Sequence, residues 1–157
     1  MGIAYVPEDR RIYPDFTVKE NLEVALCQSR GQTGWSHSKV FTLFPALEKI
    51  QGRLGHQLSG GEAQMLTIAR GLLTNPELLL LDEASEGLAP LVVANLFEAI
   101  KEMRSQGLSI LMSEQNSRFA SKIADKVYIL DSTKVVFEGT CAEFVQDEQM
   151  ARRYLLV

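Results

Sequence analysis

Two short strings in this sequence of 157 residues carry side chains whose types and spacing could do chemistry. The first, residues 58–64, reads Leu-Ser-Gly-Gly-Glu-Ala-Gln, and apolar residues follow it at helical spacing. Ser59 and Glu62 alone form the Ser-x-x-Glu pattern of a capping box. The two glycines need a further reason, because glycine is about 1 kcal/mol less favourable than alanine inside a helix. Close approach of a ligand to bare backbone N–H groups is such a reason, so the string predicts a phosphate-binding helix N-terminus.

The second string, residues 78–83, is an apolar run that ends in two acids, Asp82 and Glu83. It predicts a buried strand, and ligands of a parallel sheet bind at the carboxyl ends of its strands. An aspartate there can hold Mg²⁺, directly or through water, and a neighbouring glutamate can polarise an attacking water. Solvated acids at a strand end would explain this string alone. The two strings together favour a site for a phosphorylated ligand.

The first half of the chain is predicted to hold one strand and then only helices. Residues 3–6 form an apolar run stopped by Pro7 and predict a buried strand. Thr17 and Glu20 form a second capping box, ahead of a helix. Residues 31–38 are loop-like, and apolar residues around Pro45 predict one or two short helices.

The second half returns to strands. Residues 78–81, a helix from Pro90 to about Arg104 and residues 108–112 predict a parallel βαβ unit. A short helix at 117–124 leads into a hairpin at 127–137, with its turn at 131–134. Thr140 and Glu143 form a third capping box, and Asp147 could cap a last helix that contains Ala151 and Tyr154.

Composition excludes several classes of protein. The chain has 16 basic and 20 acidic residues, a net charge of −4, which gives no overall positive field for nucleic acid. Cys27 and Cys141 lie far apart, with no metal-binding spacing near His37 or His56, so neither zinc nor a disulfide framework is expected. The longest purely apolar run is short and the sequence opens on no signal-peptide pattern, so we expect a soluble chain of the reducing cytosol.

With both strings in place, the sequence resembles the ATP-binding subunits of ABC transporters over essentially its whole length. Residues 58–62 resemble the signature motif and residues 78–83 the Walker B strand, in the family's order and separation. Residues 6–14 and 17–22 resemble the Q-loop and the start of the helical subdomain; residues 85–90 resemble the D-loop and 113–116 the H-loop. The Pro-Glu-x-Arg-Arg, Gly-Leu-Ala-Pro and Glu-Gln-Asn strings are most similar to branched-chain amino acid importer ATPases.

The resemblance implies an α/β fold: a partial P-loop NTPase core with parallel strands, an α-helical signature subdomain and a C-terminal β-hairpin plus helices. It divides the chain into the Q-loop strand and loop (1–16), the helical subdomain (17–75), and the Walker B, D-loop and H-loop core with the tail (76–157). It also implies ATP and Mg²⁺ as cofactors. The implied site residues are Glu83 and Gln115 for catalysis; Ser59, Gly60, Gly61, Glu62, Gln64 and Glu8 for nucleotide; and Asp82 and Glu8 for the metal.

The chain departs from the family pattern at several of these positions. Glu8 stands where the Q-loop has glutamine, and Gln115 where most members have histidine. Ala89 replaces the usual D-loop aspartate, and Ala84 replaces a proline. Glu86 adds an acid close to the catalytic carboxylate, and the sequence assigns it no role.

No glycine in the sequence is followed by lysine, so the chain has no Gly-x-x-x-x-Gly-Lys-Ser/Thr phosphate loop. The resemblance begins at the Q-loop strand, so the amino-terminal part of the nucleotide-binding domain is expected to be absent. In the family, each ATP lies between the phosphate loop of one subunit and the signature helix of the other. We therefore expect the isolated chain to bind ATP weakly or not at all, and not to hydrolyse it.

The expected function is that of the carboxy-terminal part of an importer ATPase for branched-chain amino acids. The resemblance implies permease subunits as partners of the helical region and Q-loop, a second ATPase subunit paired head to tail, and a place at the inner face of the cell membrane. A non-catalytic interaction module, which pairs with a complete ATPase or completes a split domain, is the alternative. A chromosome-maintenance or repair ATPase is disfavoured, because no coiled-coil heptads appear. Exposed strand edges also predict self-association.

Overall fold

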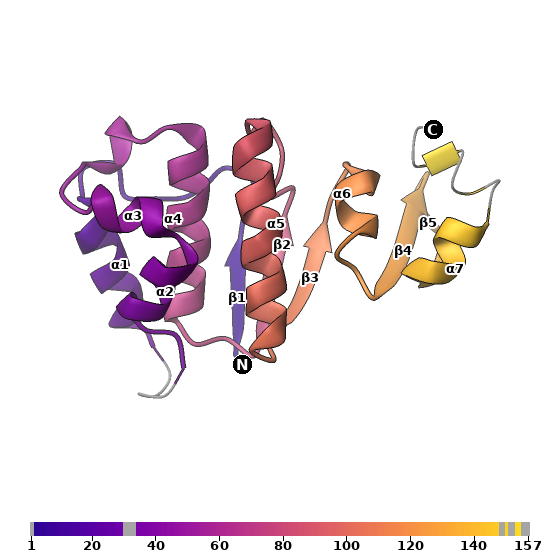
Figure 1. Cartoon of the computed structure of the whole chain (residues 1–157), viewed down its shortest axis with the longest axis horizontal. Helices are drawn as coiled ribbons and strands as arrows, with labels where there is room; N and C mark the ends of the chain where they lie inside the picture. The colour runs from indigo at the N-terminus through magenta and orange to yellow at the C-terminus, as the bar shows by residue number, and fades with distance from the viewer. Residues whose placement is uncertain (1, 30–33, 148–149, 151–152, 155–157) are drawn as a thin grey trace. The chain divides into compact units, whose positions relative to one another are not determined.

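The computed structural model describes residues 2–29, 34–147, 150 and 153–154 (Figure 1). Its contacts divide the chain into two units, Met1–Ser113 and Glu114–Val157, each with its own internal packing. The sequence predicted divisions of the chain between residues 16 and 17 and between residues 75 and 76, and both positions fall within the first unit. Residues 31–33 of the predicted loop and Ala151 of the predicted last helix lie outside the described residues.

The first unit contains a three-stranded sheet in the order β1-β2-β3. The strands β1 (Ile3–Val6), β2 (Leu78–Asp82) and β3 (Ser109–Ser113) are parallel throughout. Helix α5 (Pro90–Ser105) connects β2 to β3, with proline in its first turn. Gly107, at φ 85°, adopts the left-handed conformation that ends such a helix. The predicted parallel βαβ unit is confirmed.

The sheet has one covered face and one open face. On the covered face, Val6 pairs with Leu81 and both are buried. Helix α4 packs directly on this face, since a Cβ at Gly71 would lie 3.3 Å from Val6 Cγ2. On the opposite face Ile3, Tyr5 and Leu111 are 48%, 56% and 59% exposed. The prediction that residues 3–6 form a buried strand is therefore wrong for Ile3 and Tyr5, because no described helix of the first unit covers their face.

Residues 17–74 form the helical region, as predicted. Its helices are α1 (Val18–Leu26), α2 (His37–Leu43), α3 (Pro45–Lys49), the 3₁₀ turn η1 (Gly55–Gln57) and α4 (Gly60–Leu73). Figure 1 shows α1, α2 and α3 gathered beside α4. An isolated bridge between Thr17 and Leu54 is its one extended contact among the described residues. The large apolar side chains that are fully buried in these helices are Val18, Leu22, Val40, Leu47, Leu66, Ile68, Leu72 and Leu73.

Asn21 fixes the loop between β1 and α1. Its side chain is fully buried, and its Oδ1 accepts a hydrogen bond from Tyr13 N at 2.9 Å. Its Nδ2 lies 3.0 Å from Tyr13 O, 3.2 Å from Phe16 O and 3.0 Å from Thr17 O. One amide therefore satisfies several backbone groups of a loop that has no regular structure.

The second unit is built on a hairpin. Its strands β4 (Lys126–Asp131) and β5 (Lys134–Thr140) are antiparallel, with α6 (Ser117–Ser121) before them and α7 (Cys141–Gln146) after them. Ser132 and Thr133 have φ values of 48° and 68°, which two-residue hairpin turns require. The predicted hairpin is confirmed, and α6 is shorter than predicted. Asp147 Oδ1 accepts from Met150 N at 3.0 Å, as a cap of the predicted last helix would.

None of the described helices combines the length and apolar character needed to cross a membrane.

Candidate functional site

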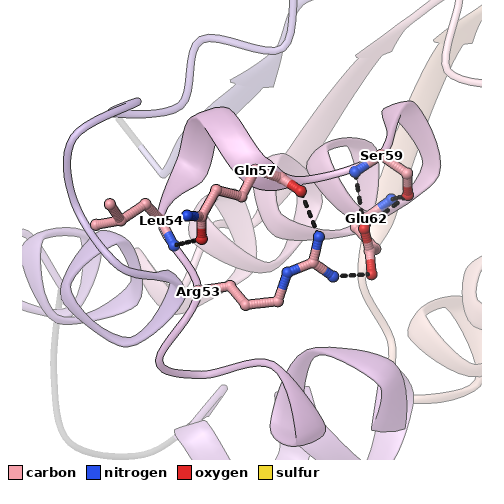
Figure 2. A network of polar contacts seen from close by, with 5 residues as sticks. All are labelled: Arg53, Leu54, Gln57, Ser59 and Glu62. Carbon is pink, nitrogen blue, oxygen red and sulfur yellow. Dashed lines mark hydrogen bonds and ion pairs between the residues drawn. The ribbon is translucent and has the colours of Figure 1, made fainter.

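The amino terminus of α4 is held by a complete capping box (Figure 2). Glu62 Oε2 accepts hydrogen bonds from both Ser59 N and Ser59 Oγ at 2.7 Å. Ser59 Oγ in turn accepts from Glu62 N at 3.3 Å. The capping interpretation of Ser59 and Glu62 is therefore confirmed, with Ser59 as the N-cap of α4.

Arg53 holds the second oxygen of the same carboxylate. Its Nη1 lies 2.9 Å from Glu62 Oε1, and its Nη2 donates to Gln57 O, as Figure 2 shows. Burial raises the pKa of Glu62, but the hydrogen bonds from Ser59 and the Arg53 guanidinium outweigh it, so the pKa lies below its ordinary value. Glu62 is therefore ionised, and its contacts with Ser59 and Arg53 connect the first turn of α4 to the preceding loop.

The two glycines of this turn serve packing and leave amides uncovered. A Cβ at Gly61 would lie 2.9 Å from both Val92 methyl groups of α5, and one at Gly60 would lie 2.9 Å from Arg10 Nη1. Within the described part of the chain, no group accepts a hydrogen bond from the amide of Gly60 or Gly61. Close helix packing therefore explains Gly61, and the exposed helix N-terminus keeps donors that could face an anion.

Asp82 ends β2 between two hydroxyl donors. Tyr5 OH donates to its Oδ2 at 2.8 Å, and Ser113 Oγ donates to its Oδ1. The Ser113 hydroxyl, followed by that of Tyr5, holds the pKa of Asp82 below its ordinary value. The hydrogen bond from Tyr5 to Asp82 raises the pKa of Tyr5, because it stabilises the protonated phenol. Asp82 is thus an ionised carboxylate at the carboxyl edge of the sheet.

Three glutamates converge just beyond this edge. One carboxylate oxygen from each of Glu8, Glu83 and Glu86 lies within 4.8 Å of the others. Glu83 has φ 45°, a conformation that costs a non-glycine residue energy and often marks a functional turn. Its amide donates to Ser113 O at 3.1 Å, and its carbonyl accepts from Glu86 N at 3.0 Å. Oxygen ligands in such a group suit Mg²⁺, which would also relieve the repulsion between the carboxylates.

Two further predicted site residues are the glutamines Gln64 and Gln115. Gln64 is 3% exposed, and its Oε1 accepts from Arg10 Nε at 3.0 Å, so its amide contacts this chain's own arginine. Gln115 belongs to the second unit, whereas the other predicted site residues belong to the first. The nucleotide and metal roles of all these residues remain predictions.

The sequence did not predict three features of this region: the contact of Arg10 with Gln64, the contact of Tyr5 with Asp82, and the place of Glu86 beside Glu8 and Glu83. Glu86 is an acid at an unusual position, and its short separation from Glu83 in the sequence indicated that the two could lie close together. Arg10 and Tyr5 gave no such signal, because their contacts join residues more than 50 positions apart in sequence, with separations of 54 and 77.

Comparisons with known proteins agree with this architecture. A family model described as ABC transporter matches residues 1–86. The branched-chain amino acid transport ATP-binding protein BraG of Pseudomonas aeruginosa is 38% identical over 155 residues, covering 98% of this chain and 66% of the relative. The lipopolysaccharide export ATP-binding protein LptB of Haemophilus influenzae is 34% identical over 157 residues, covering 98% of this chain and 65% of the relative. The chain thus spans slightly less than two thirds of these relatives.

A solved structure shares the fold. The dimeric ATP-binding cassette MJ0796, bound to ADP and Pi, superposes with a TM-score of 0.75 at 22% identity. That match covers 88% of this chain and 62% of the other.

Proposed function

Because the chain belongs to the ABC transporter family, we propose that it is the carboxy-terminal part of an ATP-binding subunit that couples ATP hydrolysis to transport. The observation that carries this proposal is the first turn of α4. There the amides of Gly60 and Gly61, next to the Ser59 capping box, form an uncovered helix N-terminus in the family's signature sequence, an arrangement that suits an anion. In the complete assembly this turn faces the phosphates of an ATP held by the phosphate loop of a second subunit.

The acidic edge of the sheet takes the hydrolytic role. Mg²⁺ would be held by Asp82 and by Glu8, and when bound it would neutralise phosphate charge. A carboxylate oxygen of Glu86 lies within 4.8 Å of one from Glu8, so Glu86 could contribute a further ligand. Glu83 orients and polarises the attacking water. The family pattern assigns Gln115 a contact between its neutral amide and the γ-phosphate. The donor set fits a hard cation, since every contributing group in the cluster is a carboxylate oxygen.

For the cargo, we propose branched-chain amino acids. The Pro-Glu-x-Arg-Arg string at residues 7–11 and the 38% identity to BraG support an importer of this class. LptB, named for lipopolysaccharide export, is less similar, at 34% identity.

The partners are a second ATP-binding subunit, paired head to tail, and membrane permease subunits, so the chain lies at the cytoplasmic face of the membrane. Two neighbouring aromatic side chains, which are exposed on a fixed loop, support the permease contact. Tyr13 and Phe16 have ring centroids 5.3 Å apart and remain exposed, while Asn21 fixes the loop that carries them. The Arg70 guanidinium lies 4.6 Å from the Tyr13 ring centroid and orients it.

The open face of the sheet favours a second candidate, an interaction module that pairs with a complete ATPase or completes a split domain. Ile3, Tyr5 and Leu111 share this face, and parallel sheets are normally covered on both sides. A partner segment that covers this face would bury these side chains.

The first test is to measure ATP binding and hydrolysis by this chain alone. Isothermal titration with MgATP is expected to give no micromolar binding, and a phosphate-release assay no turnover, because the sequence has no phosphate-loop lysine. Micromolar binding with turnover that Glu83→Gln abolishes would overturn the view that the site is incomplete.

A further inference from the structure

The backbone of Arg10 adopts a conformation that is unfavourable for a non-glycine residue, so contacts with the surrounding residues must stabilise it. It lies two residues after Glu8 and has φ 48°, in the left-handed region that non-glycine residues rarely adopt. Its amide donates to Pro7 O at 3.3 Å, and its carbonyl accepts from Ile12 N at 2.5 Å. A tight turn therefore aims the Arg10 side chain away from its own segment.

The guanidinium reaches two distant elements at once. Its Nε donates to Gln64 Oε1 in α4 at 3.0 Å, and its Nη2 donates to Glu86 O at 3.1 Å. Gln64 is buried, so this acceptor is held in place by the packing of α4. The guanidinium donates from two nitrogens held at a fixed spacing in one plane, whereas a lysine ammonium presents all its donors from a single nitrogen on a flexible stem.

We propose that Arg10 is a positioning residue that ties the acidic turn at residues 83–86 to the first two turns of α4, so that the two move as one body. Its functional meaning rests on the proposed function. In a head-to-tail pair, Ser59 and Glu83 of one chain serve two different ATP molecules. Arg10 then couples the two ATP sites through the body of a single subunit.

The neighbouring arginine supplies a matched control. Arg11 pairs with Asp9 at 2.9 Å, two residues away, and its side chain is 76% exposed. It has the same charge and lies in the same loop, but this side-chain contact is local. The substitution Arg11→Lys should therefore leave the link intact.

The test is a double-mutant cycle read by amide hydrogen exchange on this chain. Gln64→Met removes the acceptor while keeping an unbranched side chain of similar length. In the presence of Arg10, it is expected to speed exchange of residues 86–88 by at least about twofold, the lower end of coupling between contacting residues. In the Arg10→Lys background, the same substitution should leave exchange of residues 86–88 unchanged. General destabilisation would not produce this dependence on background.

The Arg11→Lys background should behave as wild type. Equal effects of Gln64→Met in the wild-type and Arg10→Lys backgrounds would overturn the proposal. If Arg10→Lys fails to fold, Gln64→Glu replaces it: this variant keeps an acceptor for Arg10 Nε, so it should preserve wild-type exchange at residues 86–88 where Gln64→Met does not. Neither nucleotide nor metal enters the measurement, so its failure is separate from failure of the proposed ATPase role.

Discussion

The Glu62 carboxylate has two opposing effects at the N-terminus of α4. It caps the helix through Ser59 and binds Arg53, yet it also places a negative charge beside the amides proposed to face phosphate. The Arg53 guanidinium balances this charge, and the helix dipole favours an anion at the same end. The carboxylate therefore stabilises the turn while leaving the Gly60 and Gly61 donors available.

Replacement of Glu62 should show this role as a pH-dependent loss of stability. The folded chain lowers the pKa of Glu62 from its ordinary value of 4.5, so its contribution is present above that value and is lost as pH falls through the lower folded pKa. Glu62→Gln is expected to reduce the free energy of unfolding by about 1 kcal/mol near pH 7, with the difference shrinking in acid. Urea unfolding followed by fluorescence of the single tryptophan, Trp35, measures it.

Glu48→Gln is the matched control, because Glu48 is an exposed glutamate near the start of another helix, α3. It should change stability little. A stability difference for Glu62→Gln that stays constant from neutral to acid pH would contradict the assigned role of the carboxylate.

Between elements, the approach of α4 to α5 depends on the absence of a side chain at Gly61. Gly61→Ala places a methyl group 2.9 Å from both Val92 methyls, and overpacking of this kind costs about 1–3 kcal/mol. Thermal unfolding should show the loss, and adding Val92→Ala should recover part of it. Gly52→Ala is the control, since a Cβ at Gly52 would meet nothing within 4 Å. Equal behaviour of the two alanine variants would refute the packing explanation.

Local patterns in the sequence predicted the elements better than their assembly. The capping boxes at Thr17, Ser59 and Thr140 are all present, because each is decided within a few residues. The parallel strands and the hairpin followed from apolar runs and turn residues. The exposure of Ile3 was not predicted, because an apolar run does not reveal whether a second layer covers it.

The candidate site was predicted only in part, because some of its contacts depend on how distant elements are assembled. Glu83 stood out because it follows a strand directly, whereas its convergence with Glu8 and Glu86 depends on the turn geometry after β2. Arg10 could not be foreseen, since its acceptors lie in α4 and in a backbone carbonyl far along the chain.

For the whole molecule, the open sheet face and the edge strands predict self-association. Among the described strands of the first unit, β1 and β3 each pair on one side only, and Ile3, Tyr5 and Leu111 are exposed beside them. Burial of apolar surface favours association by about 25 cal/mol for each Å² removed from water. Light scattering should give a mass that rises with concentration, and Leu111→Lys should reduce it. A monodisperse monomer at high concentration would contradict this prediction.

We propose that Ser59 and Glu83 belong to an ATPase site that this chain only partly supplies. The most direct measurement is phosphate release by a fusion of the amino-terminal third of BraG, expected to carry the phosphate loop, to this chain. The fusion is expected to hydrolyse MgATP and to lose this activity on Glu83→Gln, and the unfused chain is expected to show no hydrolysis. A folded fusion that binds MgATP but hydrolyses it equally well with Glu83→Gln would contradict it.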